Sequence, residues 1–381
     1  MTGEGGRRPE LDAIRLTVVL GLVFFHSALV FDERDDFYVK NPQTTEAVTW
    51  LAGFGVVWAM PALFLIGGFG AWHSMRRRGS GGFVRERLLR LGVPLVFATL
   101  TIIPVPQWLR LKAADPAYDE SYPRFLLSFF DVHLSLRDFP FLLQGDYFET
   151  GHLWFVVLLL TFSLLLALFV RWLPADRLGF VSRRGWLLVI PAIPLMVVGA
   201  LLGMEEAFAG WSRWAYLLLF LYGFVLAADD SFRIAMRRDA KPAAIIGFLI
   251  FGASGALLGT YDGEPFTDMT AHAIAARIVF AAAGWCLLVG ILGLLDRGAS
   301  GSRETSGKRR PVLAYLAEAA LPLYILHQPI VVAVAYFAVR WNTAMIVKYL
   351  AIVAISFVVM FAAYDVLVRR TGPTRFLFGM R

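Results

Sequence analysis

The sequence predicts an all-α polytopic membrane protein, and two observations carry this prediction. First, 58% of the 381 residues are hydrophobic and only 17% are charged, whereas soluble domains carry roughly a quarter charged residues. Second, apolar runs of about 20 residues, the length that crosses a bilayer as a helix, recur along most of the chain. A transmembrane barrel requires short alternating segments instead, and the sequence does not contain them.

Ten apolar runs are predicted to span the membrane as a single bundle over residues 1–381. They cover residues 10–31, 49–74, 84–105, 152–172, 186–204, 212–229, 242–260, 271–295, 312–337 and 345–368. The segments between them alternate in charge: "MRRRGSGGFVRER" is basic, for example, and "YDGEPFTDMTAH" is acidic. By the positive-inside rule the basic set, which includes the N-terminus and the C-terminal tail, is cytoplasmic. Both termini are therefore expected inside, which agrees with an even number of spans.

The distribution of the basic residues also indicates the partner of the protein. The net charge is +7, which by itself would suit nucleic acid. Because the basic residues occur in alternate loops, we expect a lipid bilayer and no nucleic acid as partner. The single cysteine, Cys286, lies in an apolar run. The sequence thus predicts a buried thiol, excludes an intrachain disulfide or a cysteine metal cluster, and gives no reason to expect a metal.

The longest predicted outer loop, residues 106–151, is a candidate substrate cap. It mixes acidic side chains with aromatic ones, among them Trp108, Tyr118 and Tyr147. Long loops with apolar residues of their own are usually functional, and aromatic faces bind sugar rings well. A simple packed cap over the bundle explains the same residues equally well.

The first span carries ionisable side chains inside an otherwise apolar run. Arg15 and His26 lie 11 positions apart, close to three helical turns, so their side chains face the same side of the helix. His26 is expected about 16 Å deeper than Arg15, toward the outer leaflet. An unsatisfied polar group in hydrocarbon costs several kcal/mol. This face of the helix is therefore predicted to line the interior of the bundle.

Two further histidines are expected in the middle to outer half of the bundle. His152 stands at the outer mouth of the fourth span, and His327 lies about midway along the ninth, with Tyr324 three residues earlier on the same face. Glu149 and Arg277 are other polar candidates on this side. For each histidine the structural alternative is a residue that only satisfies buried hydrogen bonds. Ionisable residues inside a membrane nevertheless mark function more often than those of soluble proteins.

Three arginines, Arg85, Arg87 and Arg90, lead into the third span at the inner surface. Arg87 and Arg90 share a helix face at a spacing of three residues. A guanidinium fork binds phosphate through parallel hydrogen bonds, so these arginines are candidate ligands of a phosphorylated molecule that arrives from the cytoplasm. Plain topology marking by arginine explains the run equally well.

Five segments resemble, in order along the chain, the signatures of the membrane acyltransferase-3 family. They are "LDAIRLTVVLGLVFFH", "MPALFLIGGFGAWH", "FVRERLLRLGVP", "GHLWFVV" and "LPLYILHQP". The resemblance covers essentially the whole chain. It implies a multi-pass enzyme of the cell (inner, cytoplasmic) membrane. Such an enzyme transfers an acyl group from cytoplasmic acyl-CoA to a hydroxyl of an extracytoplasmic acceptor, commonly a glycan.

The resemblance also implies roles for individual residues. His26 corresponds to the catalytic histidine of the family and Arg15 to its partner on the same helix face. The three arginines at the inner surface belong to the coenzyme-binding side. In such a mechanism His26 is the general base or carries the acyl group covalently. His327, Tyr324 or His152 would orient this base or stabilise the developing oxyanion.

Two departures from the family pattern bear on the acyl donor. Phe155 stands where many members that O-acetylate surface polysaccharides have serine, and Gly67 replaces a serine of the second span. Both features look closer to the glucan-succinyltransferase branch of the family. The donor therefore stays open between acetyl-CoA and succinyl-CoA, and the sequence leaves the oligomeric state open too.

A proton-coupled multispan exporter is the alternative function. Ten spans with a polar stripe and intramembrane histidines suit such a transporter as well. It would move its substrate without covalent change and without coenzyme A. The sequence contains no clear inverted repeat, which weighs against this alternative.

Overall fold

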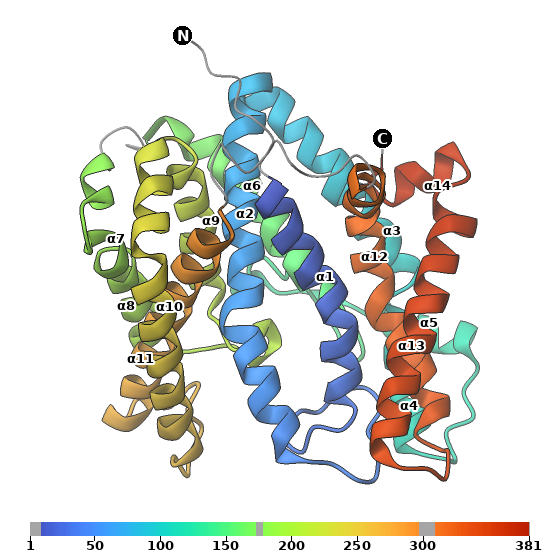
Figure 1. The fold of residues 1–381 in the computed structure, drawn as a ribbon. Helices are drawn as coiled ribbons and strands as arrows, with labels where there is room; N and C mark the ends of the chain where they lie inside the picture. The colour runs from blue at the N-terminus through green and yellow to red at the C-terminus, as the bar shows by residue number, and fades with distance from the viewer. Residues whose placement is uncertain (1–8, 173–177, 297–308, 381) are drawn as a thin grey trace. The chain divides into compact units, whose positions relative to one another are not determined.

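The structure is a computed structural model that describes residues 9–172, 178–296 and 309–380. Its α-helices are α1 (Pro9–Leu29), α2 (Glu46–Arg87), α3 (Val93–Thr101), α4 (Pro104–Ala114), α5 (Tyr122–Phe129), α6 (Trp154–Phe169), α7 (Trp186–Val189), α8 (Ala192–Leu202), α9 (Arg213–Leu226), α10 (Asp230–Gly259), α11 (Ala271–Leu295), α12 (Arg309–Ala338), α13 (Met345–Ala363) and α14 (Gly372–Leu377). Figure 1 shows their arrangement along the chain.

Shorter elements join these helices. There are two π-helical turns, Leu88–Gly92 and Tyr364–Val368, and 3-10 turns at Leu136–Asp138, Gly151–Leu153, Val170–Trp172, Gly179–Ser182 and Glu206–Phe208. In the described residues the strands are limited to β1 (His133–Leu134) and β2 (Leu143–Gln144), which pair antiparallel. The basic N-terminal residues 1–8 and the loop residues 173–177 and 297–308, which contribute to the predicted charge pattern, lie outside the described residues.

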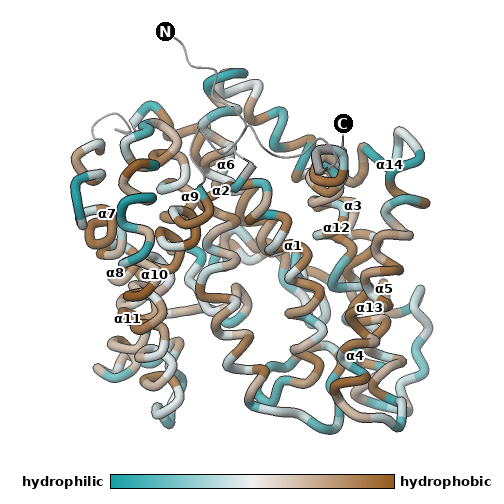
Figure 2. The backbone as a smooth tube through the Cα atoms, viewed as in Figure 1, coloured by the Kyte–Doolittle hydropathy of each residue, from teal (hydrophilic) through white to brown (hydrophobic). Residues whose placement is uncertain are grey.

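Eight helical stretches of the described chain are long and apolar enough to cross a membrane. They are Glu10–Leu29, Glu46–Ala114, Gly151–Trp172, Glu206–Leu226, Asp230–Gly259, Ala271–Leu295, Pro311–Ala338 and Met345–Val368. Figure 2 shows hydrophobic residues along most of their length. The all-α polytopic class predicted from the sequence is thus confirmed.

Three of the predicted spans do not match one of these eight stretches one to one. The predicted spans 49–74 and 84–105 fall within the single stretch Glu46–Ala114, where Gly79 (φ 69°) interrupts the helical backbone. The predicted span 186–204 falls on the shorter apolar stretch Trp186–Leu202. Hydropathy locates apolar runs, whereas a backbone break such as that at Gly79 depends on one residue that can adopt a positive φ.

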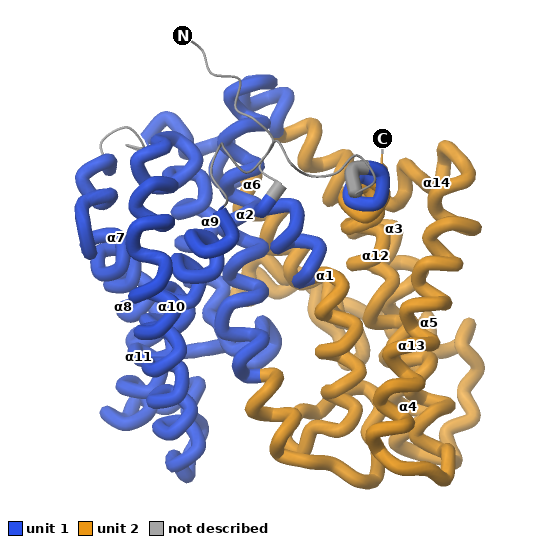
Figure 3. Tube along the Cα trace, viewed as in Figure 1, with its two compact units in different colours: residues 1–18, 53–83, 165–314 blue, residues 19–52, 84–164, 315–381 orange. Residues whose placement is uncertain are grey.

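Close contacts between Cα atoms divide the chain into two compact units (Figure 3). Unit 1 comprises Met1–Val18, Gly53–Phe83 and Leu165–Ala314, and unit 2 comprises Val19–Ala52, Val84–Leu164 and Tyr315–Arg381. The first half of α1 therefore belongs to unit 1 and its second half to unit 2. All three histidines predicted to act together, His26, His152 and His327, lie in unit 2.

Unit 1 contains a contact in which the backbones of two helices touch. A Cβ atom built on Gly68 of α2 would lie 1.9 Å from the carbonyl oxygen of Phe220 in α9, and one built on Gly223 would lie 1.9 Å from that of Leu65. Only hydrogen atoms fit at these two places. Close approach at small residues is how membrane helices gain packing energy when lipid offers no hydrophobic driving force.

We expect Gly68→Ala to lower the free energy of unfolding by about 1–3 kcal/mol, the usual cost of an added methyl group in a packed interior. Gly53→Ala on the same helix is the matched control, because nothing lies within 4 Å of its Cβ position. Thermal unfolding of the two variants in detergent measures the difference. Equal midpoints would show that α2 and α9 do not pack in this way.

The predicted outer loop 106–151 is structured in unit 2 as the end of α4, α5 and the β1–β2 hairpin. The indole nitrogen of Trp108 donates to the carbonyl of Glu120 at 3.1 Å. Phe125 and Phe129 are fully buried. This segment therefore has a small aromatic core of its own, and its role as a substrate cap stays a prediction.

Candidate functional site

Three histidine rings from different parts of the chain meet in unit 2. His26 lies near the end of α1, His152 in the 3-10 turn before α6, and His327 in α12. The centroid of the His327 ring lies 5.1 Å from that of His26 and 4.8 Å from that of His152. His152 and His327 are buried, with 5% and 1% exposure, whereas His26 is half-buried. We call these three residues the histidine cluster.

Pro329 explains why His152 binds α12 where it does. Proline has no N–H group, so the carbonyl of Ile325, four residues earlier, lacks its usual helical donor. Nε2 of His152 lies 3.0 Å from this carbonyl oxygen. Because a carbonyl oxygen only accepts, Nε2 carries the ring proton and Nδ1 carries the lone pair. Tyr324 also holds the 3-10 turn that contains His152, since its hydroxyl donates to the backbone carbonyl of His152.

A backbone carbonyl also fixes the tautomer of His327. Its Nδ1 lies 2.5 Å from the carbonyl oxygen of Tyr324, so Nδ1 donates and Nε2 keeps the lone pair. Nε2 of His327, Nδ1 of His152 and Nδ1 of His26 are all inaccessible to solvent and have no hydrogen-bond partner among the described residues. A buried polar atom without a partner costs about 1–3 kcal/mol. Three such atoms meet in this cluster, which makes it the candidate functional site.

The loop after α1 closes one side of the histidine cluster. The ring of Phe37 stacks on that of His26, with centroids 5.6 Å apart and 23° between the planes. The hydroxyl of Tyr38, the next residue, donates to the Glu149 carboxylate. Burial raises the pKa of Glu149, against the opposing effects of this hydrogen bond and of the Arg110 charge. The carboxyl group therefore holds its proton more strongly than an exposed glutamate does.

The raised pKa of Glu149 predicts how stability depends on pH. The native state binds more protons than the unfolded chain at pH values between the ordinary value of 4.5 and the raised one, so unfolding becomes easier as pH rises through this window. Glu149→Gln keeps an acceptor for Tyr38 but cannot titrate. We expect the variant to lose this part of the decline in melting temperature, measured from pH 4 upward. Parallel pH profiles for wild type and variant would contradict the burial of this carboxyl group.

Arg15 lies far from the histidine cluster along α1. Its 11-residue separation from His26 corresponds to about 16 Å of helix, and its guanidinium pairs with Asp12 at 3.3 Å. A partnership between Arg15 and His26 is therefore not a direct contact.

The three arginines predicted to bind the coenzyme lie where α2 ends. Arg85 is exposed and Arg87 half-buried in the last turn of α2. Arg90 belongs to the π-helical turn Leu88–Gly92, and its side chain is 49% exposed and 3.8 Å from Glu86. π-helical turns are rare and occur frequently at functional sites. Within unit 2, the start of α3 and the loop that follows α1 lie at opposite ends in Figure 1.

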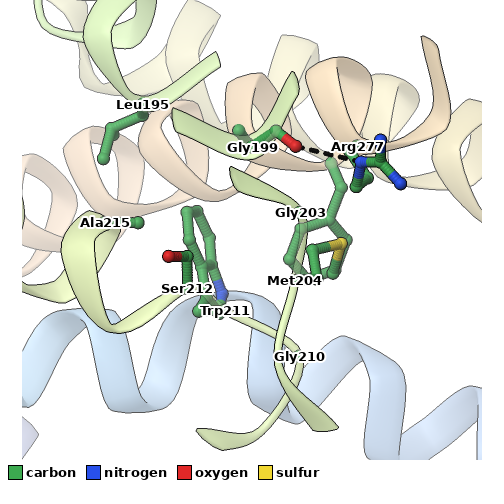
Figure 4. A pocket seen from close by; sticks show the side chains of 11 residues that line it. Leu195, Gly199, Gly203, Met204, Gly210, Trp211, Ser212, Ala215 and Arg277 are labelled. Carbon is green, nitrogen blue, oxygen red and sulfur yellow. Dashed lines mark hydrogen bonds between the residues drawn. The ribbon is translucent and has the colours of Figure 1, made fainter. Parts of the chain in front are cut away.

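A separate pocket lies in unit 1 and contains no residue of the histidine cluster (Figure 4). Its lining is mostly apolar and includes the ring of Trp211. Arg277, another polar candidate from the sequence, is fully buried beside it. Its Nε donates to the carbonyl of Gly199 at 2.9 Å and its Nη1 to that of Pro265 at 2.8 Å. The guanidinium of Arg277 thus satisfies backbone carbonyls, which is a structural role.

Four residues beside the histidine cluster were not predicted from the sequence: Phe37, Tyr38, Gln328 and Pro329. Tyr38 lies 111 positions from its partner Glu149, so no local pattern connects them. Gln328, which is 4% exposed, and Pro329 directly follow His327. A proline inside a predicted helix does indicate that the carbonyl four residues earlier, here that of Ile325, lacks its helical donor.

The chain matches the acyltransferase-3 family, described as an acyltransferase domain, over residues 8–365. No curated protein and no solved structure matches it. The match includes every predicted site residue from Arg15 to His327 and leaves residues 366–380 beyond it. Because it covers nearly the whole chain, and the described chain contains helices that can cross a membrane, this protein belongs to the acyltransferase-3 family and is a multi-pass membrane acyltransferase.

Proposed function

We propose that this protein transfers an acetyl or succinyl group from cytoplasmic acyl-CoA to a hydroxyl of an extracytoplasmic glycan, in the cytoplasmic membrane. The observation that carries the proposal is the histidine cluster, with its three inaccessible ring nitrogens that have no partner among the described residues. Imidazole is the side chain best suited to take a proton from a hydroxyl near neutral pH.

His26 is the general base in this proposal. It is half-buried, whereas His152 and His327 are enclosed, so among the three it is the ring that a substrate reaches. When substrate binds, the free lone pair on Nε2 of His327 accepts the N–H of His26 in this proposal, which orients the other ring nitrogen of His26 toward the hydroxyl. Hydrogen bonds of this kind often tighten only when substrate is bound, and a ring separation of 5.1 Å suits such a rearrangement.

The reaction balances with these groups alone. The acceptor oxygen attacks the thioester carbonyl, its proton passes to His26, and the new C–O bond forms as the C–S bond breaks. His26 then returns the proton to the coenzyme A thiolate. An acyl-His26 intermediate gives the same products in two steps. A burst of free thiol in the absence of acceptor distinguishes this route from direct transfer.

Arg87 and Arg90 bind the phosphates of the donor in this proposal. Replacing either with alanine is expected to raise KM for acyl-CoA about tenfold or more, the scale of one charge-assisted hydrogen bond, and to leave kcat nearly unchanged. Arg124→Ala is the control, because this arginine is 80% exposed in the outer segment. A fall in kcat at constant KM would place these arginines outside donor binding.

The experiment that tests the function combines two measurements. The purified protein, reconstituted in liposomes, is supplied with acetyl-CoA or succinyl-CoA, and the release of free thiol is followed with and without glycan. Mass spectrometry of the envelope glycans of cells with and without the gene identifies the added acyl mass. We expect thiol release that depends on the glycan and a matching mass difference. Movement of an unchanged substrate without any dependence on coenzyme A would favour the exporter.

A further inference from the structure

The segment Thr371–Met380 lies beyond the family match, yet it packs against the junction of α2 and α3, which carries Arg85, Arg87 and Arg90. We call these three arginines the arginine motif. Gly379 is the point of contact. A Cβ atom built on it would lie 2.5 Å from the carbonyl oxygen of Arg90 and 2.9 Å from both Leu321 and Pro94. The φ of Gly379 is 71°, a conformation that residues with a side chain rarely adopt. Glycine is therefore required here for two independent reasons.

Pro94 makes this contact available. It has no N–H group, so the carbonyl of Arg90, four residues earlier, lacks the donor that an α-helix would provide. The π-helical turn Leu88–Gly92 moves the chain further from regular geometry, since the N–H of Val93 bonds to the carbonyl of Leu88, five residues back. Gly379 packs directly on the Arg90 carbonyl at this irregular turn.

Two further contacts hold the segment in place. The ring of Phe378 packs edge-on against Phe97 of α3, with centroids 5.5 Å apart. Arg375 donates to the carboxylate of Glu318 in α12 at 3.0 Å. Phe378 is 7% exposed and Met380 9% exposed. The segment is thus packed on both α3 and α12 and is not a free tail.

We propose that the segment Thr371–Met380 is a positioning element for the acyl donor, with Gly379 as its key residue. It fixes the backbone at Arg90 and thereby the direction in which the exposed guanidinium of Arg90 meets the phosphates of coenzyme A. The inference rests on the proposed function, because it takes coenzyme A as the ligand of the arginine motif. The segment itself makes no contact with the donor in this proposal.

Gly379→Ala and Gly372→Ala form a matched pair that tests the inference. The first adds a methyl group against Arg90, whereas nothing lies within 4 Å of the Cβ position of Gly372. Binding of coenzyme A to the full-length protein in detergent is measured by calorimetry, together with the melting temperature, KM for acetyl-CoA and kcat. We expect Gly379→Ala to weaken binding and to raise KM about tenfold, the effect of losing one well-placed charged hydrogen bond. Its melting temperature is expected to fall, because the added methyl group meets a backbone carbonyl, whereas its kcat stays close to that of Gly372→Ala.

Each outcome shows whether the segment Thr371–Met380 positions Arg90 for coenzyme A. Unchanged affinity in Gly379→Ala overturns the inference, and so does a loss of affinity that only follows a general loss of stability and kcat. If wild type itself does not bind coenzyme A, the proposed donor is wrong, which is a different failure. Should Gly379→Ala not fold, hydrogen exchange on wild type replaces it. Coupling is reciprocal, so coenzyme A must slow amide exchange in Thr371–Met380, and unchanged exchange overturns the inference.

Discussion

His26→Ala is expected to lower kcat by about 10²–10⁴-fold, the contribution that a positioned general base typically makes. The ring that it removes contacts Phe37 and His327 and contributes one of the inaccessible nitrogens of the histidine cluster. No other half-buried imidazole of the described residues belongs to this cluster. We therefore expect the loss to appear in kcat, with KM for acyl-CoA nearly unchanged because the arginine motif is intact.

The controls for His26→Ala separate chemistry from folding. His133 is exposed on strand β1, and His133→Ala is expected to keep wild-type turnover. Both variants are compared with wild type for yield in the membrane fraction and for melting temperature. A folded His26→Ala protein that retains near-normal turnover would show that another group removes the proton.

The sequence predicted the membrane class and the participants of the histidine cluster better than it predicted their contacts. The length of apolar runs follows directly from the bilayer thickness, so the membrane class could be predicted, whereas ten spans were predicted and eight stretches of the described chain are long and apolar enough to cross a membrane. The grouping of His26, His152 and His327 was an expectation from depth alone. Which nitrogen of each ring carries the proton depends on the carbonyls of Ile325 and Tyr324. Such contacts depend on how separate helices pack, which no local pattern contains.

Arg15 and Glu149 illustrate the limits of spacing arguments. Arg15 and His26 do share one side of α1, but a helix that aligns two side chains also keeps them about 16 Å apart. Glu149 precedes His152 by three residues, yet its partner is Tyr38 from the loop after α1. Proximity in sequence identified a candidate in each case, and tertiary packing determined what it contacts.

The segment after residue 365 makes contacts that no sequence pattern predicts. The family match ends there, while the chain continues through α14 to Gly379, whose Cβ position lies 2.5 Å from the carbonyl oxygen of Arg90. The sequence alone predicts only a basic C-terminal tail on the cytoplasmic side here. The contacts of Arg375, Phe378 and Gly379 show that this tail is packed.

His327→Phe is expected to lower kcat about 10²-fold with little change in either KM, because it keeps an aromatic ring in the buried site but removes the Nε2 lone pair that orients His26. In this mechanism His327 contributes to catalysis only by orienting His26. Adding His327→Phe to His26→Ala should therefore cause almost no further loss, since residues that act as one unit are strongly non-additive.

His272→Phe is the matched control for this cycle. Nε2 of His272 lies 2.9 Å from the carbonyl of Leu257, and its ring packs against Tyr261 in unit 1, so its replacement is expected to change stability and not kcat. If the two losses of His26→Ala and His327→Phe multiply in the double variant, the two imidazoles work independently. His327 would then contribute packing to the site, and the orientation of His26 would have to come from another group, such as the Phe37 ring that stacks on it.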